Sequence, residues 1–181
     1  MSEFNFSPFP ELQTERLILR KPDASDIIEL KRLRSNELVN KYIDRPKTID
    51  ITDVQKFLSK INDGLEKNEL LYWAIAPKSE YELKGTIGLW NFSENKESCE
   101  IGYELHPSMH GRGIMQEAIK AVIDFGFREL KLKQIIAFTH PDNSASQKIL
   151  ERNGFVIRGR NTNENRDYIY SKESHIEDLQ S

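Results

Sequence analysis

The chain has 181 residues, 38% of them hydrophobic, which fits one globular domain able to bury roughly 70% of its unfolded surface. The net charge is −3 and charges of both signs are mixed along the chain, which argues against direct nucleic-acid binding. A single cysteine excludes an intramolecular disulfide, and no apolar stretch approaches the roughly 20 residues of a membrane span, so we expect a cytoplasmic protein that does not bind membranes.

A strand and two helices are predicted in the first third of the chain. Residues 15–21 alternate polar and apolar side chains as a half-buried strand does, and Pro22 ends that pattern. Asp23 can cap a helix that continues to Arg34. A second helix is predicted from about residue 52 to 67, because its apolar residues recur every three or four positions.

The middle of the chain predicts three strands followed by a helix. The strands cover residues 70–76, 84–92 and 99–106, and their short polar connectors favour an antiparallel meander. After Pro107 the apolar residues take a helical spacing that lasts until about Leu130. This amphipathic helix is expected to pack on the sheet.

The last third predicts one more helix among three strands. Residues 134–139 read as a strand, 144–152 as a helix that stops at Gly154, and 155–159 and 167–171 as closing strands. No repeat or linker divides the chain. We therefore expect one α/β domain over residues 1–181, with a mixed, largely antiparallel sheet of about seven strands and four helices on its faces.

The turn before the third helix has the features of an anion site. Gly111 and Gly113 let the backbone approach a ligand closely, and the free N–H groups of the helix start point at negative charge. A pyrophosphate would fit such a turn. The alternative is a structural strand-to-helix turn without a ligand.

Three segments resemble the GNAT acetyltransferases. The acyl-CoA signature of that superfamily, Gln/Arg-x-x-Gly-x-Gly/Ala, is partly matched by HGRGIM at residues 110–115, where His110 and Met115 are departures and Gly113 is retained. GRGIMQEA, the segment HPDNSASQKILERNGF at 140–155 and TERLILRKPDASD at 14–26 are similar to the RimJ/RimL branch of ribosomal-protein N-acetyltransferases. The resemblance covers nearly the whole chain.

This resemblance implies an acetyl-CoA-dependent N-acetyltransferase in which the amine attacks the thioester directly. The implied contacts of acetyl-CoA are Tyr103, Leu105, His110, Gly111, Arg112, Gly113, Ile114, Met115, Asn143, Ser146 and Lys148. Asn143 and Ser146 lie three residues apart on one helix face, so both side chains can contact the same ligand. The alternative is a purely structural role, in which Asn143 caps the helix and Ser146 faces solvent.

Two candidate catalytic residues follow from the implied fold. Ser146 is the candidate proton donor to the departing thiolate, and Glu104 is the candidate base, acting directly or through water. Glu164 is the alternative base, and an α-amine with a pKa near 8 needs little help from any base. Cys99 precedes an apolar strand residue and is expected in the core rather than as a nucleophile.

The acceptor and the partners are less defined by the sequence. A protein N-terminal α-amine, as of a ribosomal protein, is the leading acceptor, with polyamines, antibiotics or other small amines as alternatives; a homodimer is compatible with the sequence. A non-catalytic acyl-CoA-binding domain is a further alternative, whereas a nucleotide binder is disfavoured because the chain lacks G-x-x-x-x-G-K-[ST]. His106 and His110 are not expected to bind a metal, because Pro107 and the glycines prevent a regular helix there.

Overall fold

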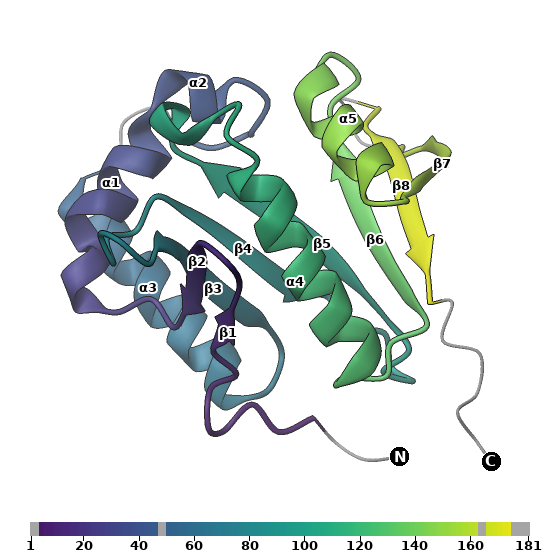
Figure 1. The fold of residues 1–181 in the computed structure, drawn as a ribbon, viewed down its shortest axis with the longest axis horizontal. Coiled ribbons are helices and arrows are strands. Elements are labelled where there is room, and N and C mark those ends of the chain that lie inside the picture. The colour runs from purple at the N-terminus through teal and green to yellow at the C-terminus, as the bar shows by residue number, and fades with distance from the viewer. Residues whose placement is uncertain (1–3, 47–49, 163–165, 175–181) are drawn as a thin grey trace.

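The computed structural model describes residues 4–46, 50–162 and 166–174 (Figure 1). A short hairpin opens the chain and three helices follow it, after a single 3-10 turn at Ala24–Asp26. Their bounds are β1 Leu12–Gln13, β2 Leu17–Arg20, α1 Ile27–Ser35, α2 Glu37–Asn40 and α3 Ile51–Glu66.

The remaining elements alternate strands with two helices. A second 3-10 turn, Pro107–Met109, comes directly before the longer of these helices. The bounds are β3 Leu71–Pro77, β4 Gly85–Trp90, β5 Ser98–Leu105, α4 Ile114–Arg128, β6 Gln134–Thr139, α5 Ser144–Arg152, β7 Val156–Arg160 and β8 Tyr168–Glu173.

All eight strands form one sheet in the order β1-β2-β3-β4-β5-β6-β8-β7. Only β5 and β6 run parallel, and every other neighbouring pair is antiparallel. The parallel pair needs a crossover, which α4 provides. The expected mixed, mostly antiparallel sheet is confirmed.

The parallel pair separates after three residues. Pairing of β5 with β6 covers only Ser98 to Glu100, whereas β5 stays paired with β4 as far as Leu105. On its other side β6 remains paired with β8 up to Thr139. Residues 101–105 of β5 therefore lack a paired strand on one side, and the sheet opens between β5 and β6.

The helices cover both faces of the sheet. Adjacent residues of a strand point to opposite faces, and Tyr72 contacts Phe57 of α3 while Trp73 contacts Phe125 of α4. Helices α3 and α4 therefore lie on opposite faces. A side-chain hydrogen bond from Gln116 of α4 to Asn153 places the end of α5 beside α4 (Figure 1).

Sequence signals account for the helix starts. Asp23 accepts a hydrogen bond from the Ser25 N–H and forms a reciprocal capping box with Asp26, so the predicted cap is confirmed, although the first turn is a 3-10 turn. A second capping box, formed by Asp50 and Asp53, begins α3. The helix starts within one residue of its predicted start at about residue 52.

Two short elements were missed. Strand β1 has two residues and α2 has four, too few to give a periodic signal, so the expected seven strands and four helices become eight and five. Burial in the sheet also confirms Cys99 as a core residue, 1% exposed. Across the described parts of the chain, every helix is too short or too polar to cross a bilayer.

Candidate active site

The start of α4 has the backbone shape expected of an anion site. Gly113 is the residue before the helix and has a φ of 73°, in the left-handed region that favours glycine. The first intrahelical bond runs from the Glu117 N–H to the Gly113 carbonyl, so the N–H groups of residues 114–116 precede that ladder. The side chains of Ile114 and Met115 are buried in the core, which leaves their backbone N–H groups as the atoms able to meet a ligand.

A network that the sequence interpretation missed holds this turn. Glu117, in the first turn of α4, accepts hydrogen bonds from the backbone N–H of Arg16 at 2.8 Å and from its Nε at 2.7 Å. Arg16 Nη1 also donates to the Arg112 carbonyl at 2.8 Å, and the Thr14 hydroxyl donates to Glu117. Thr14 and Arg16 belong to the TERL segment, so that motif was the available signal for this role.

Glu117 should stabilise the fold in a pH-dependent way. Burial alone would raise its pKa, but the hydrogen bonds from Thr14 and Arg16 outweigh burial and lower the pKa below its ordinary value. A lowered pKa in the folded state means that the stabilisation is present above the unfolded-state value of about 4.3 and is lost as the pH falls through the folded-state value.

We therefore expect Glu117→Gln to lower the free energy of unfolding at pH 7 by about 1 kcal/mol, discounted for the half-exposed Arg16. Urea unfolding at several pH values measures this difference, which should shrink below about pH 4. The exposed Glu94 provides the control, since Glu94→Gln should be neutral at both pH values. A difference for Glu117→Gln that is constant with pH would contradict the proposed ionic role.

The other predicted contacts around this turn differ in accessibility. His110 Nε2 lies 3.0 Å from the Leu105 carbonyl, so this imidazole binds the end of β5. Arg112 is exposed and Gly111 has a φ of 70° with open space where a Cβ would be. Lys148 is exposed on α5. Gly111 and Arg112 are therefore accessible to an anionic ligand at the start of α4.

Ser146 faces β5 rather than solvent. The Tyr103 hydroxyl lies 2.9 Å from Ser146 Oγ and connects β5 with the first turn of α5. Asn143 is the cap of α5, because its Oδ1 accepts the Ser146 N–H at 3.1 Å. The Asn143 side-chain oxygen therefore caps the helix, as the structural alternative predicted. That alternative also placed Ser146 toward solvent, whereas its hydroxyl contacts Tyr103.

Glu104 lies on the opposite face of the sheet from Tyr103. Its carboxylate pairs with Arg45, which precedes α3, and its Oε1 is 3.9 Å from Arg34 Nη1 of α1. The three side chains are 14%, 7% and 19% exposed in the order Glu104, Arg45, Arg34. Sequence reasoning found Glu104 but not the arginines, which come from segments distant along the chain.

The Glu104 cluster has unused hydrogen-bonding atoms. Glu104 Oε2, Arg45 Nε and Arg45 Nη1 are buried without a partner among the described residues. Burial lowers the pKa of Arg34 and the nearby Arg45 lowers it further, while the carboxylate of Glu104 opposes both. Buried polar atoms usually have partners, so the free Glu104 Oε2 is suited to accept an N–H from an incoming ammonium group.

Other candidates from the sequence are not part of this cluster. Glu164 lies outside the described residues. Burial raises the pKa of the Cys99 thiol to about 12, which makes it a poor nucleophile. Within residues 4–46, 50–162 and 166–174, the structure brings no three metal-ligating side chains together. His106 instead contacts Ser108.

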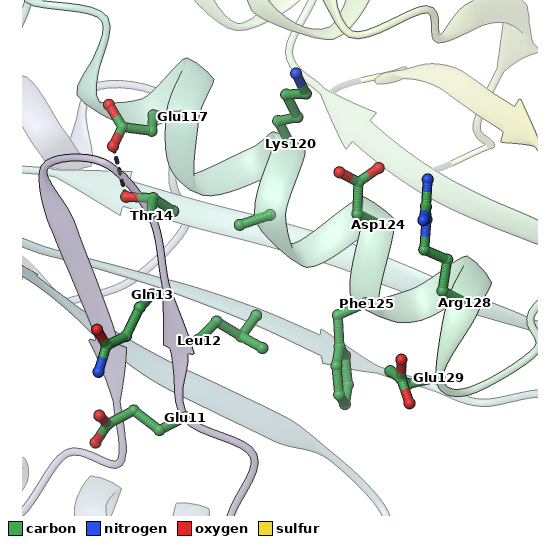
Figure 2. Close-up of a pocket in the computed structure, with 11 residues that line it drawn as sticks. Glu11, Leu12, Gln13, Thr14, Glu117, Lys120, Asp124, Phe125, Arg128 and Glu129 are labelled. Atoms are coloured by element: carbon green, nitrogen blue, oxygen red, sulfur yellow. Dashed lines mark hydrogen bonds between the residues drawn. The ribbon is translucent and has the colours of Figure 1, made fainter.

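A separate groove of about 480 Å³ lies between β1 and α4 (Figure 2). Leu12 and Phe125 point toward its interior, and charged side chains of both signs surround them (Figure 2). None of the sequence-predicted site residues lines it. The predicted residues Tyr103, Glu104 and Ser146 lie instead at the end of β5 and the start of α5, beside the opening between β5 and β6.

A match to a protein family identifies the family to which this chain belongs. The family described as Acetyltransferase (GNAT) domain matches residues 16–156. The chain belongs to the GNAT family. It is an acetyl-CoA-dependent N-acetyltransferase with the GNAT fold, so the predicted enzyme class and fold class are confirmed.

Relatives of this GNAT chain include proteins named as N-acetyltransferases. It is 32% identical over 148 residues to "Uncharacterized N-acetyltransferase p20" of Bacillus licheniformis, covering 82% of this chain and 83% of the relative. It is also 32% identical over 80 residues to the ribosomal-protein-serine acetyltransferase of Escherichia coli K12, covering 44% and 45% of the two chains. A solved structure of RimL, a ribosomal L7/L12 alpha-N-protein acetyltransferase in complex with coenzyme A, superposes with a TM-score of 0.78 at 22% identity, covering 91% of this chain and 98% of that one.

The residues of this chain fit acetyl-CoA. The left-handed Gly113, the N–H groups at the start of α4 and the exposed Arg112 suit a diphosphate. The end of β5 beyond Glu100 is not paired with β6, so its edge is suited to bind an extended arm. GNAT acetyltransferases use acetyl-CoA as the acyl donor, which supplies the activated acetyl group.

Proposed function

We propose that this enzyme acetylates a protein N-terminal α-amine, such as that of a ribosomal protein. One observation carries the proposal: Glu104 and the Tyr103–Ser146 pair lie on opposite faces of the same strand end. Donor and acceptor can therefore approach the β5–β6 opening from different faces and meet without an acyl-enzyme. The named ribosomal-protein relative supports the choice of acceptor.

In the proposed mechanism, residues on the two faces of the strand have different roles. Glu104 Oε2 accepts an N–H of the incoming amine and takes a proton from it, directly or through water. As the C–N bond forms and the C–S bond breaks, the Ser146 hydroxyl donates a hydrogen bond to the departing sulfur, which leaves as a thiolate. The start of α4, with Gly113 and Arg112, holds the diphosphate.

An α-amine suits this site better than a lysine side chain does. Its pKa is near 8, so an appreciable fraction is neutral at pH 7, whereas a lysine near 10.4 is almost fully protonated. The proposed base, Glu104, is a carboxylate, and carboxylates as a class are weak bases. A weak base is adequate for an amine that deprotonates easily.

Acetyl transfer to matched peptides tests this proposal. We expect mass spectrometry to find one acetyl group on a peptide with a free N-terminus and an internal lysine, and none on the same peptide with a blocked N-terminus. Spermidine is the small-amine competitor. Acetylation of spermidine but of neither peptide would replace the proposed acceptor, and failure of acetyl-CoA to bind in calorimetry would overturn the assigned donor site.

A further inference from the structure

The hydrogen bond between Tyr103 and Ser146 joins the two halves of the opened sheet. Tyr103 lies on β5 beyond the last pairing with β6, and Ser146 lies on the helix that follows β6. Their hydroxyl oxygens are 2.9 Å apart although the residues are 43 positions apart in sequence. Among the described residues, Tyr103 is the one side chain that hydrogen-bonds Ser146 Oγ.

The chemistry of the two hydroxyls sets the direction of this bond. A phenol is a stronger acid than an aliphatic alcohol, so the tyrosine is the better donor and the serine the better acceptor. A serine hydroxyl carries one hydrogen and two acceptor positions. When Tyr103 donates to Ser146 Oγ, the serine hydrogen is left free to donate to a third atom.

The backbone of Ser146 is already fixed, which leaves its side chain as the variable part. The Asn143 cap holds the Ser146 N–H, and the fully buried Leu150 anchors the same helix in the core. A serine in a helix tends to bond back to a carbonyl of the preceding turn when it has no other partner. The Tyr103 hydroxyl competes with that inward orientation.

We propose that Tyr103 is a positioning residue that holds the Ser146 hydroxyl so that its hydrogen points at the sulfur of the acyl donor. The inference rests on the donor placement proposed above. It assigns to Tyr103 a side-chain role, in addition to the acetyl-CoA contact implied by the family resemblance.

Tyr103 acts here as a hydrogen-bond donor and keeps its proton. Burial raises the pKa of the Tyr103 phenol to about 12, and the bond to Ser146 lowers it only in part. An ordinary alkyl thiol has a pKa of about 8.5, so this phenol is a weaker acid by more than about three orders of magnitude. Proton loss from Tyr103 to a thiolate is therefore unfavourable, while donation of a hydrogen bond is not.

The thiol pKa of bound coenzyme A tests the geometry without any acceptor amine. Coenzyme A labelled with carbon-13 next to its sulfur would be titrated by NMR in complex with wild type, Ser146→Ala, Tyr103→Phe and the double variant. A hydrogen bond from Ser146 favours the thiolate, so Ser146→Ala should raise the bound thiol pKa by about one unit. Cys99 does not interfere, since its own thiol has a pKa of about 12.

Tyr103→Phe should raise the bound thiol pKa nearly as much as Ser146→Ala, and the double variant no more than Ser146→Ala alone. Such non-additivity is the signature of two residues that act through one atom. Tyr170→Phe is the matched control, because it removes a tyrosine hydroxyl that donates to Glu151 near the other end of α5. The control should leave the thiol pKa at the wild-type value.

Each other outcome has a defined meaning. A rise with Ser146→Ala but not with Tyr103→Phe removes the positioning role of Tyr103, as does an equal rise with Tyr170→Phe. Wild-type values in Ser146→Ala show that Ser146 does not face the sulfur, which overturns the inference while leaving the function intact. If calorimetry detects no coenzyme A binding to the wild type, the proposed function itself fails.

Discussion

Gly113→Val should weaken the binding of acetyl-CoA by about 30-fold or more. Gly113 has a φ of 73°, which a β-branched residue adopts only at a cost of about 1–3 kcal/mol. Relief of that strain would rotate the N–H groups at the start of α4 away from the position that suits a diphosphate. Calorimetric titration with acetyl-CoA measures the loss.

Gly154→Val separates this effect from strain alone. Gly154 has a φ of 80° and ends α5 on the side away from Ser146, so the backbone cost is comparable. An added Cβ there meets the flexible tip of Lys172. We expect Gly154→Val to lower the melting temperature without a matching loss of affinity. Equal affinity losses in the two variants would remove Gly113 from the donor site.

Glu104→Ala should lower the free energy of unfolding by about 3 kcal/mol, because it leaves the buried Arg45 and the largely buried Arg34 without their anion. Urea unfolding monitored by circular dichroism measures the loss. Lys133→Ala is the control, since it removes an exposed ion pair with Glu97 and should cost under about 0.5 kcal/mol. A Glu104→Ala loss as small as this control would contradict the assigned charge pairing.

Addition of Arg45→Met to Glu104→Ala separates stability from catalysis. The second change removes a buried cation that has lost its partner, so we expect about 1 kcal/mol of the unfolding free energy to return. Turnover of the peptide acceptor should stay about 100-fold below wild type, because the oxygen that we propose accepts the amine proton is still missing. Recovery of turnover together with stability would make Glu104 a structural residue.

Local sequence was sufficient for the long elements of this fold. The hydrophobic spacing over α3 and α4 and the capping residues Asp23 and Asp50 act within a few positions, so their signals survive in the sequence. The same holds for Gly113, whose place between a strand and an amphipathic helix predicted a turn in which the backbone can approach a ligand closely; the structure adds its φ of 73°. The two-residue β1 and four-residue α2 were missed because neither completes a period.

Tertiary structure decided which of the site residues meet. Neighbouring residues of a strand such as Tyr103 and Glu104 point to opposite faces. The sequence could not show that Tyr103 contacts Ser146 and that Glu104 contacts two arginines. Contacts such as Glu104 with Arg45, or Arg16 with Glu117, join segments separated by 59 and 101 positions. Such pairings depend on how the strands and helices pack, and no periodic pattern within one segment encodes them.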